Sequence, residues 1–339
     1  MSAASTTYQH SQAPRRISDL FARRPELFTS VLLLALCAFV AAVNPDFISP
    51  ATLFDIARAS VVIGLFALGV FVVLAAGGID VSFTAIAALS MYSVTKLVVE
   101  IVPGLPLIVV FALATSIGLI LGLINGLLVH HLRVPSLIVT IGTQYAYRGL
   151  LLSFIGTVWI TILPPQMDQF GKIGLLTTTS TQGATITLPA FFLILPVVAL
   201  LTWWILSRTL LGRAIFAAGG SSQVAERLGY NLRTIHLFIF GYAGALAGLA
   251  GIVHTCSNRQ SNPFDLVGSE IDVIAAVVLG GARITGGTGT VPGVILGVLL
   301  VVVINNVLIM AGIPSTWQRV VVGAFILVAG AFLVGRRRS

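Results

Sequence analysis

The stretch from Val278 to Gly293, VLGGARITGGTGTVPG, is the first part of the sequence that invites a chemical reading. Glycine-rich turns hold phosphates in nucleotide-binding proteins because their backbone N–H groups can approach the ligand closely. The chain has no G-x-x-x-x-G-K-[ST] sequence, and Pro292 occupies the third glycine position of a G-x-G-x-x-G motif. We therefore interpret these glycines as tight turns where a helix breaks inside protein, with hydroxyl side chains satisfying the backbone.

Ionisable residues inside apolar segments form the second group. A charge in the hydrocarbon core is costly, so such residues are functional candidates. Asp80 follows Gly77-Gly78, where the carboxylate is expected to cap the next helix, with contact to a ligand as the alternative. Arg148 and Asp272 are potential partners, but the sequence does not show whether they meet.

Motifs for metal binding and for catalysis are missing from the sequence. The five histidines include no H-E-x-x-H, the two cysteines form no C-x-x-C pair, and no G-x-S-x-G occurs. We expect no metal, no cofactor and no catalytic residue, and therefore not an enzyme.

The composition indicates a membrane protein. Of 339 residues, 57% are apolar and 9% charged, and the mean hydropathy is +1.04, whereas soluble proteins carry about 25% charged residues. The predicted fold class is all-α, a polytopic transmembrane helix bundle. The net charge of +8 comes from residues that flank apolar runs, a pattern that orients membrane proteins, so nucleic-acid binding is not expected.

A transmembrane helix needs roughly 20 mostly apolar residues. On that criterion the eighth apolar segment is too short to cross alone and is interpreted as a half-helix ending at the glycine loop. The ten predicted spans are 27–43, 53–76, 82–100, 105–129, 136–155, 188–206, 233–254, 271–281, 291–311 and 317–334.

Basic residues orient these spans. RRISDLFARR, HHLR, the segment 207–236 and GRRRS alternate correctly if all lie on the cytoplasmic side. Both termini are then cytoplasmic. The predicted organisation is a tail at 1–26, one transmembrane domain at 27–335 with a cytoplasmic coupling loop at 207–236, and a tail at 336–339.

Glycines at four-residue spacing predict close helix packing in lipid. They are Gly118, Gly122 and Gly126; Gly244 and Gly248; and Gly289, Gly293 and Gly297. Packing within one chain is favoured over a dimer contact.

Two segments resemble each other, INGLLVHHLRVPSLIV (124–139) and INNVLIMAGIPSTWQRV (304–320), which is either chance or an inverted repeat. Each carries an asparagine late in a helix, Asn125 and Asn305.

The segment SSQVAERLGYN lies in the polar loop 207–236. Ser221-Ser222 resembles a helix N-cap and Gly229 a stop signal. The short helix that they predict either docks a partner or is a solvated connector.

Four stretches together resemble one family: AAGGIDVSFTAIAALSM, LINGLLVHHLRVPSLIVTIGTQYAYRGL, GRAIFAAGGSSQVAERLGYN and EIDVIAAVVLGGARITGGTGTVPGVILG. In this order and at these separations they look like permease subunits of bacterial ABC importers for ribose-type sugars and autoinducer-2, in the branched-chain amino acid and sugar permease superfamily. The resemblance covers about residues 30–335.

The resemblance implies a permease subunit of the bacterial inner membrane that moves a small sugar-like solute by alternating access. Its partners would be a second permease subunit (identical or a sister), two cytoplasmic ATP-binding subunits, a periplasmic sugar-binding protein and membrane lipid. The alternative is an ion-coupled secondary transporter or channel for small polar solutes.

The resemblance also implies site residues. The ATPase-coupling candidates are Ala225, Glu226, Arg227 and Leu228. The translocation-path candidates are Gly77, Gly78, Asp80, Ser82, Asn125, Gly280, Gly281, Gly286, Gly287 and Asn305. The long threonine-rich loop before residue 188 and Phe83-Thr84 depart from the family pattern and leave the substrate open.

Overall fold

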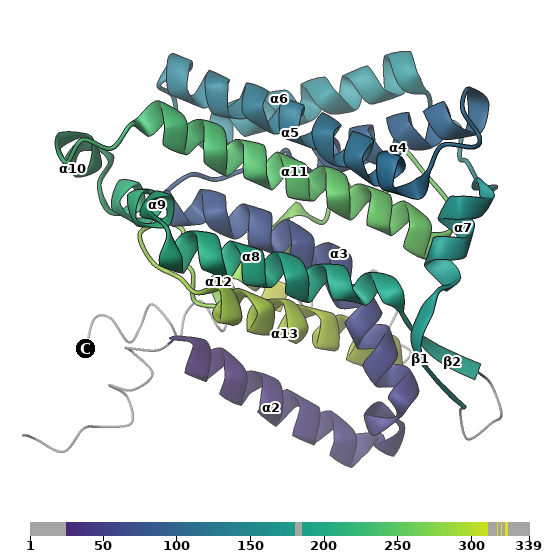
Figure 1. The fold of residues 1–339 in the computed structure, drawn as a ribbon. Coiled ribbons are helices and arrows are strands. Elements are labelled where there is room, and N and C mark those ends of the chain that lie inside the picture. Colours follow the sequence, from purple (N-terminus) through teal and green to yellow (C-terminus); the bar gives the residue numbers. More distant parts are fainter. Residues whose placement is uncertain (1–24, 180–184, 311–316, 318–319, 321–322, 325–339) are drawn as a thin grey trace, which may run out of the picture.

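A computed structural model describes residues 25–179 and 185–310 together with residues 317, 320, 323 and 324. In this part the chain forms a bundle of long helices with two short helices at one end and a β-hairpin at the other (Figure 1). The α-helices are α2 (Pro25–Val43), α3 (Pro50–Ala75), α4 (Phe83–Glu100), α5 (Leu107–Leu132), α6 (Ser136–Leu150), α7 (Pro165–Lys172), α8 (Ile194–Arg208), α9 (Leu210–Gly220), α10 (Ser222–Arg227), α11 (Leu232–Asn258), α12 (Glu270–Leu279) and α13 (Val291–Met310).

Local sequence signals fix several helix ends. Ser49 caps α3 by accepting a hydrogen bond from the Thr52 N–H, with Pro50 in the first turn. Asn231 caps α11 in the same way, and Arg259 ends it in the left-handed conformation. These signals explain why the helices match most of the predicted spans closely.

The first nine predicted spans all fall on helices of the described part, although not every one of these helices is long enough to cross a membrane. Seven helices of the described part are long and apolar enough to cross a membrane. The fifth predicted span, 136–155, is covered by α6 and the π-helical turn Leu151–Ile155 that continues it, so α6 alone is too short to be counted among the seven. The eighth forms the ten-residue α12, as expected for a half-helix. The tenth span, 317–334, and both predicted tails lie almost entirely outside the described residues.

The purely helical prediction was wrong for the loop before α8. Strand β1 (Gly174–Thr179) pairs antiparallel with β2 (Thr185–Pro189), and α7 precedes them. The β-branched run of threonine and isoleucine in these strands favours extended structure over helix. The described residues of this loop, α7 with β1 and β2, therefore form a cap at one end of the bundle, at the right of Figure 1.

The glycine ladders pack helices within the chain, as predicted. A Cβ atom on Gly118 or Gly122 of α5 would collide with carbonyl oxygens of Gly244 or Phe240 on α11. The third ladder does the same, because Gly293 and Gly297 of α13 touch the α12 backbone. Small residues allow this approach, which strengthens van der Waals contact where lipid supplies no hydrophobic drive.

An ion cluster fastens the cap to the bundle. Asp168 of α7 accepts hydrogen bonds from Lys172 and from Arg259, the residue that ends α11. These donors hold the pKa of the Asp168 carboxyl below its usual value. Gly171 lies against the Cys256 carbonyl, so α7 meets α11 backbone to backbone.

We predict that Gly122→Ala destabilises the protein by about 1–3 kcal/mol, because its methyl group must push α5 away from α11. Gly149→Ala is the matched control, since a Cβ atom there meets nothing within 4 Å. Thermal unfolding of both variants in the same detergent measures the effect. Equal melting temperatures for the two would contradict the packing argument.

We also predict that α7 loosens in acid. A carboxylate whose pKa is depressed by folding contributes stability above its unfolded pKa of about 3.9, and this is lost as the pH falls through the folded value. The protection of residues 165–172 against hydrogen exchange, corrected for the pH dependence of the intrinsic exchange rate, should therefore fall below about pH 4. In Asp168→Asn the exchange should be faster at neutral pH and lose this acid step; an unchanged acid step in that variant would exclude Asp168 as its cause.

Candidate translocation path and coupling helix

Three glycine-bearing segments meet at the end of the bundle that carries α9 and α10. The Gly287 N–H donates to the Ala75 carbonyl at 3.0 Å. A Cβ atom on Gly286 would lie 2.6 Å from the Gly77 Cα, and one on Gly219 would lie 2.5 Å from the Gly287 nitrogen. Gly77, Gly286 and Gly287 have positive φ angles, which glycine adopts at little cost. The junction therefore joins the ends of α3 and α9 to the loop between α12 and α13.

The predicted path residues Gly280 and Gly281 lie at the start of that loop. Gly280 ends α12 and touches Gly293, so it serves helix packing, while Gly281 turns the chain with φ +97°. Asn305 lies far along α13, which packs against α2, α3 and α12. No contact described for Asn305 joins it to the polar network below.

A buried polar network links the start of α4 to α5 and α6. Asp80 Oδ1 accepts hydrogen bonds from the Ser82 N–H (2.8 Å) and the Ser82 hydroxyl (2.6 Å). The Asn125 amide donates to the Ser82 hydroxyl at 2.7 Å, and the Tyr147 hydroxyl donates to the Asn125 carbonyl oxygen at 3.0 Å. Predicted residues from separate stretches, Asp80, Ser82 and Asn125, are thus brought together.

The Asp80 contacts resemble the predicted helix cap. However, the carboxylate accepts from the N–H group of Ser82, the residue that precedes α4, and not from an N–H group in the first turn of α4. Asp80 is 1% exposed, and its second oxygen has no hydrogen-bond partner among the described residues. A buried unpaired carboxylate oxygen is costly, which keeps a ligand role open.

A second polar cluster surrounds Glu270, which the sequence reasoning missed. Glu270 begins α12, accepts a hydrogen bond from the Thr84 hydroxyl of α4, and accepts another from the Gln144 amide of α6 at 2.8 Å. Its other oxygen accepts from the Gly268 N–H. Thr84 and Gln144 lie two and three residues from Ser82 and Tyr147, so the clusters are neighbours along α4 and α6. An acidic residue opening a half-helix inside a membrane protein was the signal available.

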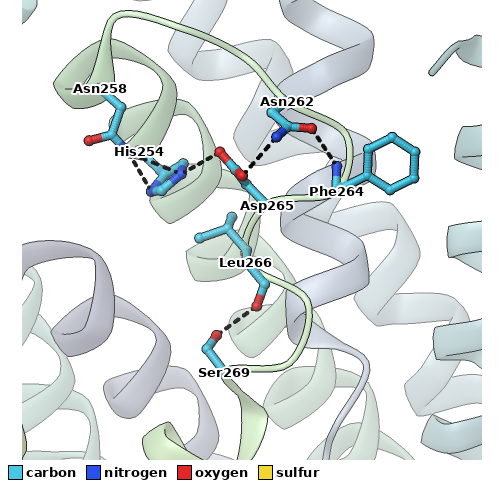
Figure 2. Close-up of polar contacts among 7 residues, drawn as sticks. All are labelled: His254, Asn258, Asn262, Phe264, Asp265, Leu266 and Ser269. Atoms are coloured by element: carbon cyan, nitrogen blue, oxygen red, sulfur yellow. Dashed lines mark hydrogen bonds and ion pairs between the residues drawn. The ribbon is translucent and has the colours of Figure 1, made fainter. Parts of the chain in front are cut away.

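The loop between α11 and α12, which leads to Glu270, is held in place by polar contacts. Figure 2 shows Asp265 held between His254 of α11 and Asn262, with the polar contacts at 3.3 and 3.1 Å. Leu266 has a φ of +71°, and its carbonyl accepts from the Ser269 hydroxyl. These contacts fix the chain between α11 and α12 before the half-helix starts.

One face of α6 is unusual for a span. Tyr145 is 71% exposed, and Arg148 is partly exposed. Gly142 and Gly149, on the same helix, have open space where a Cβ atom would stand. Polar groups and small residues are typical of a helix–helix or water-lined surface and not of one facing lipid.

A cavity of about 990 Å³ opens at the end of the bundle near α10. It lies between the α5–α6 turn, the start of α11 and the glycine junction, and Gly77, Gly78 and Gly219 form part of its wall. Its charged and imidazole side chains are His130, Arg133, Glu226, Arg233 and His236.

Helix α10 projects from the bundle at the left of Figure 1. Ser221 caps it by accepting from the Val224 N–H, as the sequence predicts. Ala225 is fully buried and anchors the helix, so it presents no surface to a partner. Glu226 and Arg227 are exposed. Val224 and Leu228 are 52% and 67% exposed and form an apolar pair, of which the sequence predicted Leu228 and missed Val224.

Comparison with known proteins places the chain in a family. Residues 52–330 match the family described as branched-chain amino acid transport system / permease component. The ribose import permease proteins of Haemophilus influenzae and Escherichia coli K12 are 33% and 32% identical, each over 88% of this chain and 90% of their own length. The autoinducer 2 import system permease protein of Yersinia pseudotuberculosis is 32% identical over 87% of this chain and 80% of its own. No solved structure matches the chain significantly.

The family match spans most of the chain, and the polar network and α10 fall within it. The matched description is that of a permease component, which moves solute and leaves ATP hydrolysis to other subunits. The chain therefore belongs to the branched-chain amino acid and sugar permease family, as the multi-pass transmembrane permease component of an ABC importer.

Proposed function

We propose that this permease imports a small polyhydroxylated solute, of the ribose or autoinducer-2 kind, across the bacterial inner membrane. The relatives that carry these substrates in their names support the solute class. The observation that carries the proposal is the membrane-embedded network around Asp80, Asn125, Gln144 and Glu270, which offers amide, hydroxyl and carboxylate groups suited to sugar hydroxyls.

Two copies, or one copy and a sister subunit, would form the path between them. Tyr145 and Arg148 support this arrangement, because these at least partly exposed side chains, beside the apolar Ile138 and Ile141, would meet a partner or the solute pathway instead of lipid. Gln144 and Tyr147 connect this part of α6 to the buried network.

The ATP-binding subunits would act on the permease through α10. Two cytoplasmic ATP-binding subunits would contact Glu226, Arg227 and Leu228, with Val224 beside them and Ala225 as the anchor. The exposed apolar pair favours docking over the solvated connector, since a connector gains nothing from exposing valine and leucine. The α10 end is then cytoplasmic, as the basic loops predict, and a periplasmic binding protein would deliver solute at the opposite end.

Movement of α10 would reach the path through the glycine junction. Helix α9 precedes α10 and ends at Gly219 and Gly220, which touch the loops of Gly77 and Gly287. Each conformation is favoured by the ligands that bind it more tightly, so ATP binding shifts the bundle only through differential contacts at α10.

We predict that Glu226→Ala/Arg227→Ala abolishes co-purification of the ATP-binding subunits while leaving the permease folded. Arg213→Ala, an exposed arginine outside α10, is the control. The measurement is an affinity pull-down from gently solubilised native membranes, with melting temperature as the test of folding. Unchanged recovery of the ATPase with the double variant would remove α10 from the interface.

Glu270→Gln is expected to lower solute uptake about tenfold or more, because it turns a charge-assisted hydrogen bond into a neutral one and sets two amides facing each other. Glu100→Gln, at the exposed end of α4, should leave uptake unchanged. Initial uptake rates at equal membrane expression measure both. Wild-type uptake in Glu270→Gln would show that this cluster is only structural.

A further inference from the structure

We propose that the cavity beside α10 is a binding site for a small phosphate-bearing anion. This goes beyond solute import. Basic residues are expected on the cytoplasmic side of a membrane protein, but here two arginines from separate segments line one cavity. The inference starts from the lining, in which two arginines and two histidines face a single carboxylate, that of Glu226.

Neither arginine is neutralised within the described part of the chain. Among the residues that the structure describes, Arg133 and Arg233 take part in no ion pair. Arg133 follows α5 in the left-handed conformation, which brings its side chain out of the helix and into the turn that walls the cavity. An arginine fork binds phosphate oxygens in pairs, so two free forks at one cavity favour a multivalent oxyanion.

Two helix N-termini add to the positive potential. Ser136, the first residue of α6, and Leu232, the first of α11, both line the cavity. The α6 terminus has no side-chain cap, so its first N–H groups are available to a ligand. Helix N-termini attract anions through these N–H groups and through the helix dipole. The C-terminal end of α5 opposes them, but it lies beside the cationic Arg133.

The histidines supply a further donor. The Nδ1 atom of His236 is buried and has no hydrogen-bond partner among the described residues. The His130 ring lies 5.9 Å from the His236 ring, so both imidazoles are at the same wall. A neutral imidazole carries one N–H group. Because the Nδ1 atom of His236 is shielded from the cavity, an anion there would accept from Nε2 of His236 or from the His130 ring.

Size sets the class of ligand. About 990 Å³ admits inorganic phosphate with its water, or a phosphorylated pentose or hexose, with room to spare. The phosphate group itself is the shared chemistry, and it could be carried by a soluble metabolite or by a lipid headgroup at the membrane surface.

Such a ligand would act on α10. An anion bridging Arg133 and Arg233 would tie the α5–α6 turn to the start of α11, while Glu226 of α10 forms part of the same wall. Resting on the proposed coupling role of α10, this would let a cytoplasmic phosphate compound restrain the ATPase contact.

The test uses the purified permease in nanodiscs of zwitterionic lipid, with titration calorimetry of inorganic phosphate, a pentose 5-phosphate and the unphosphorylated pentose. We expect both phosphates to bind and the free pentose to bind at least about tenfold more weakly. Raising the salt from low to molar concentration should weaken phosphate binding by screening the partly exposed arginines.

The variant Arg133→Gln/Arg233→Gln should lose phosphate binding by about tenfold or more, whereas Arg213→Gln should keep it. Nanodiscs containing phosphatidylglycerol separate the sources: competition by this lipid identifies a headgroup site, and its absence a site for soluble phosphate. Equal binding of pentose and pentose phosphate, no phosphate binding at low salt, or an unaffected double variant would each overturn the proposal. Because no ATPase is present, failure here leaves the proposed import function standing.

Discussion

The structure depends on one constraint: backbone and side-chain polar groups inside a membrane must find partners within the protein. Where α3, α9 and α12 end, glycine lets three loops approach closely enough for the Gly287 N–H to reach the Ala75 carbonyl. Where α4 begins, Asp80 Oδ1 accepts hydrogen bonds from Ser82, and the Ser82 hydroxyl accepts one from Asn125, while the second Asp80 oxygen has no partner among the described residues. These places interrupt the apolar packing of the bundle, and they are also where a solute could find hydrogen-bonding groups and where motion could pass from one helix to another.

The α5–α11 pair and the half-helix α12 are held in the bundle in different ways. The α5–α11 pair, joined backbone to backbone through Gly118, Gly122 and Gly244, is the most extensively packed pair of helices in the described part. The half-helix α12 is held at one end by the glycine loop and at the other by Glu270, whose partners lie on α4 and α6. In the proposed mechanism, a change in α9 or α10 would act on the glycine loops that adjoin the proposed path.

Sequence patterns predicted much of this because they report local physics. Apolar length identified the long helices, Ser221 predicted the start of α10, and glycine spacing predicted close helix packing within the chain, which the structure shows between α5 and α11. The β-hairpin was not predicted, because a short threonine run in an apolar protein is also typical of irregular loop. Glu270 escaped because its importance depends on Thr84 and Gln144, which lie 186 and 126 residues away in the chain. Burial of Ala225 beside exposed Leu228 likewise required the packing of α10 to be known.

The central claim is that this permease moves solute with energy supplied by separate ATP-binding subunits. The most direct measurement is solute uptake into proteoliposomes that hold the permease with its ATP-binding subunits and binding protein. The account predicts uptake that requires ATP on the side of α10 and persists when ion gradients are dissipated. Uptake by the permease alone, driven by a proton or sodium gradient without ATP, would contradict it.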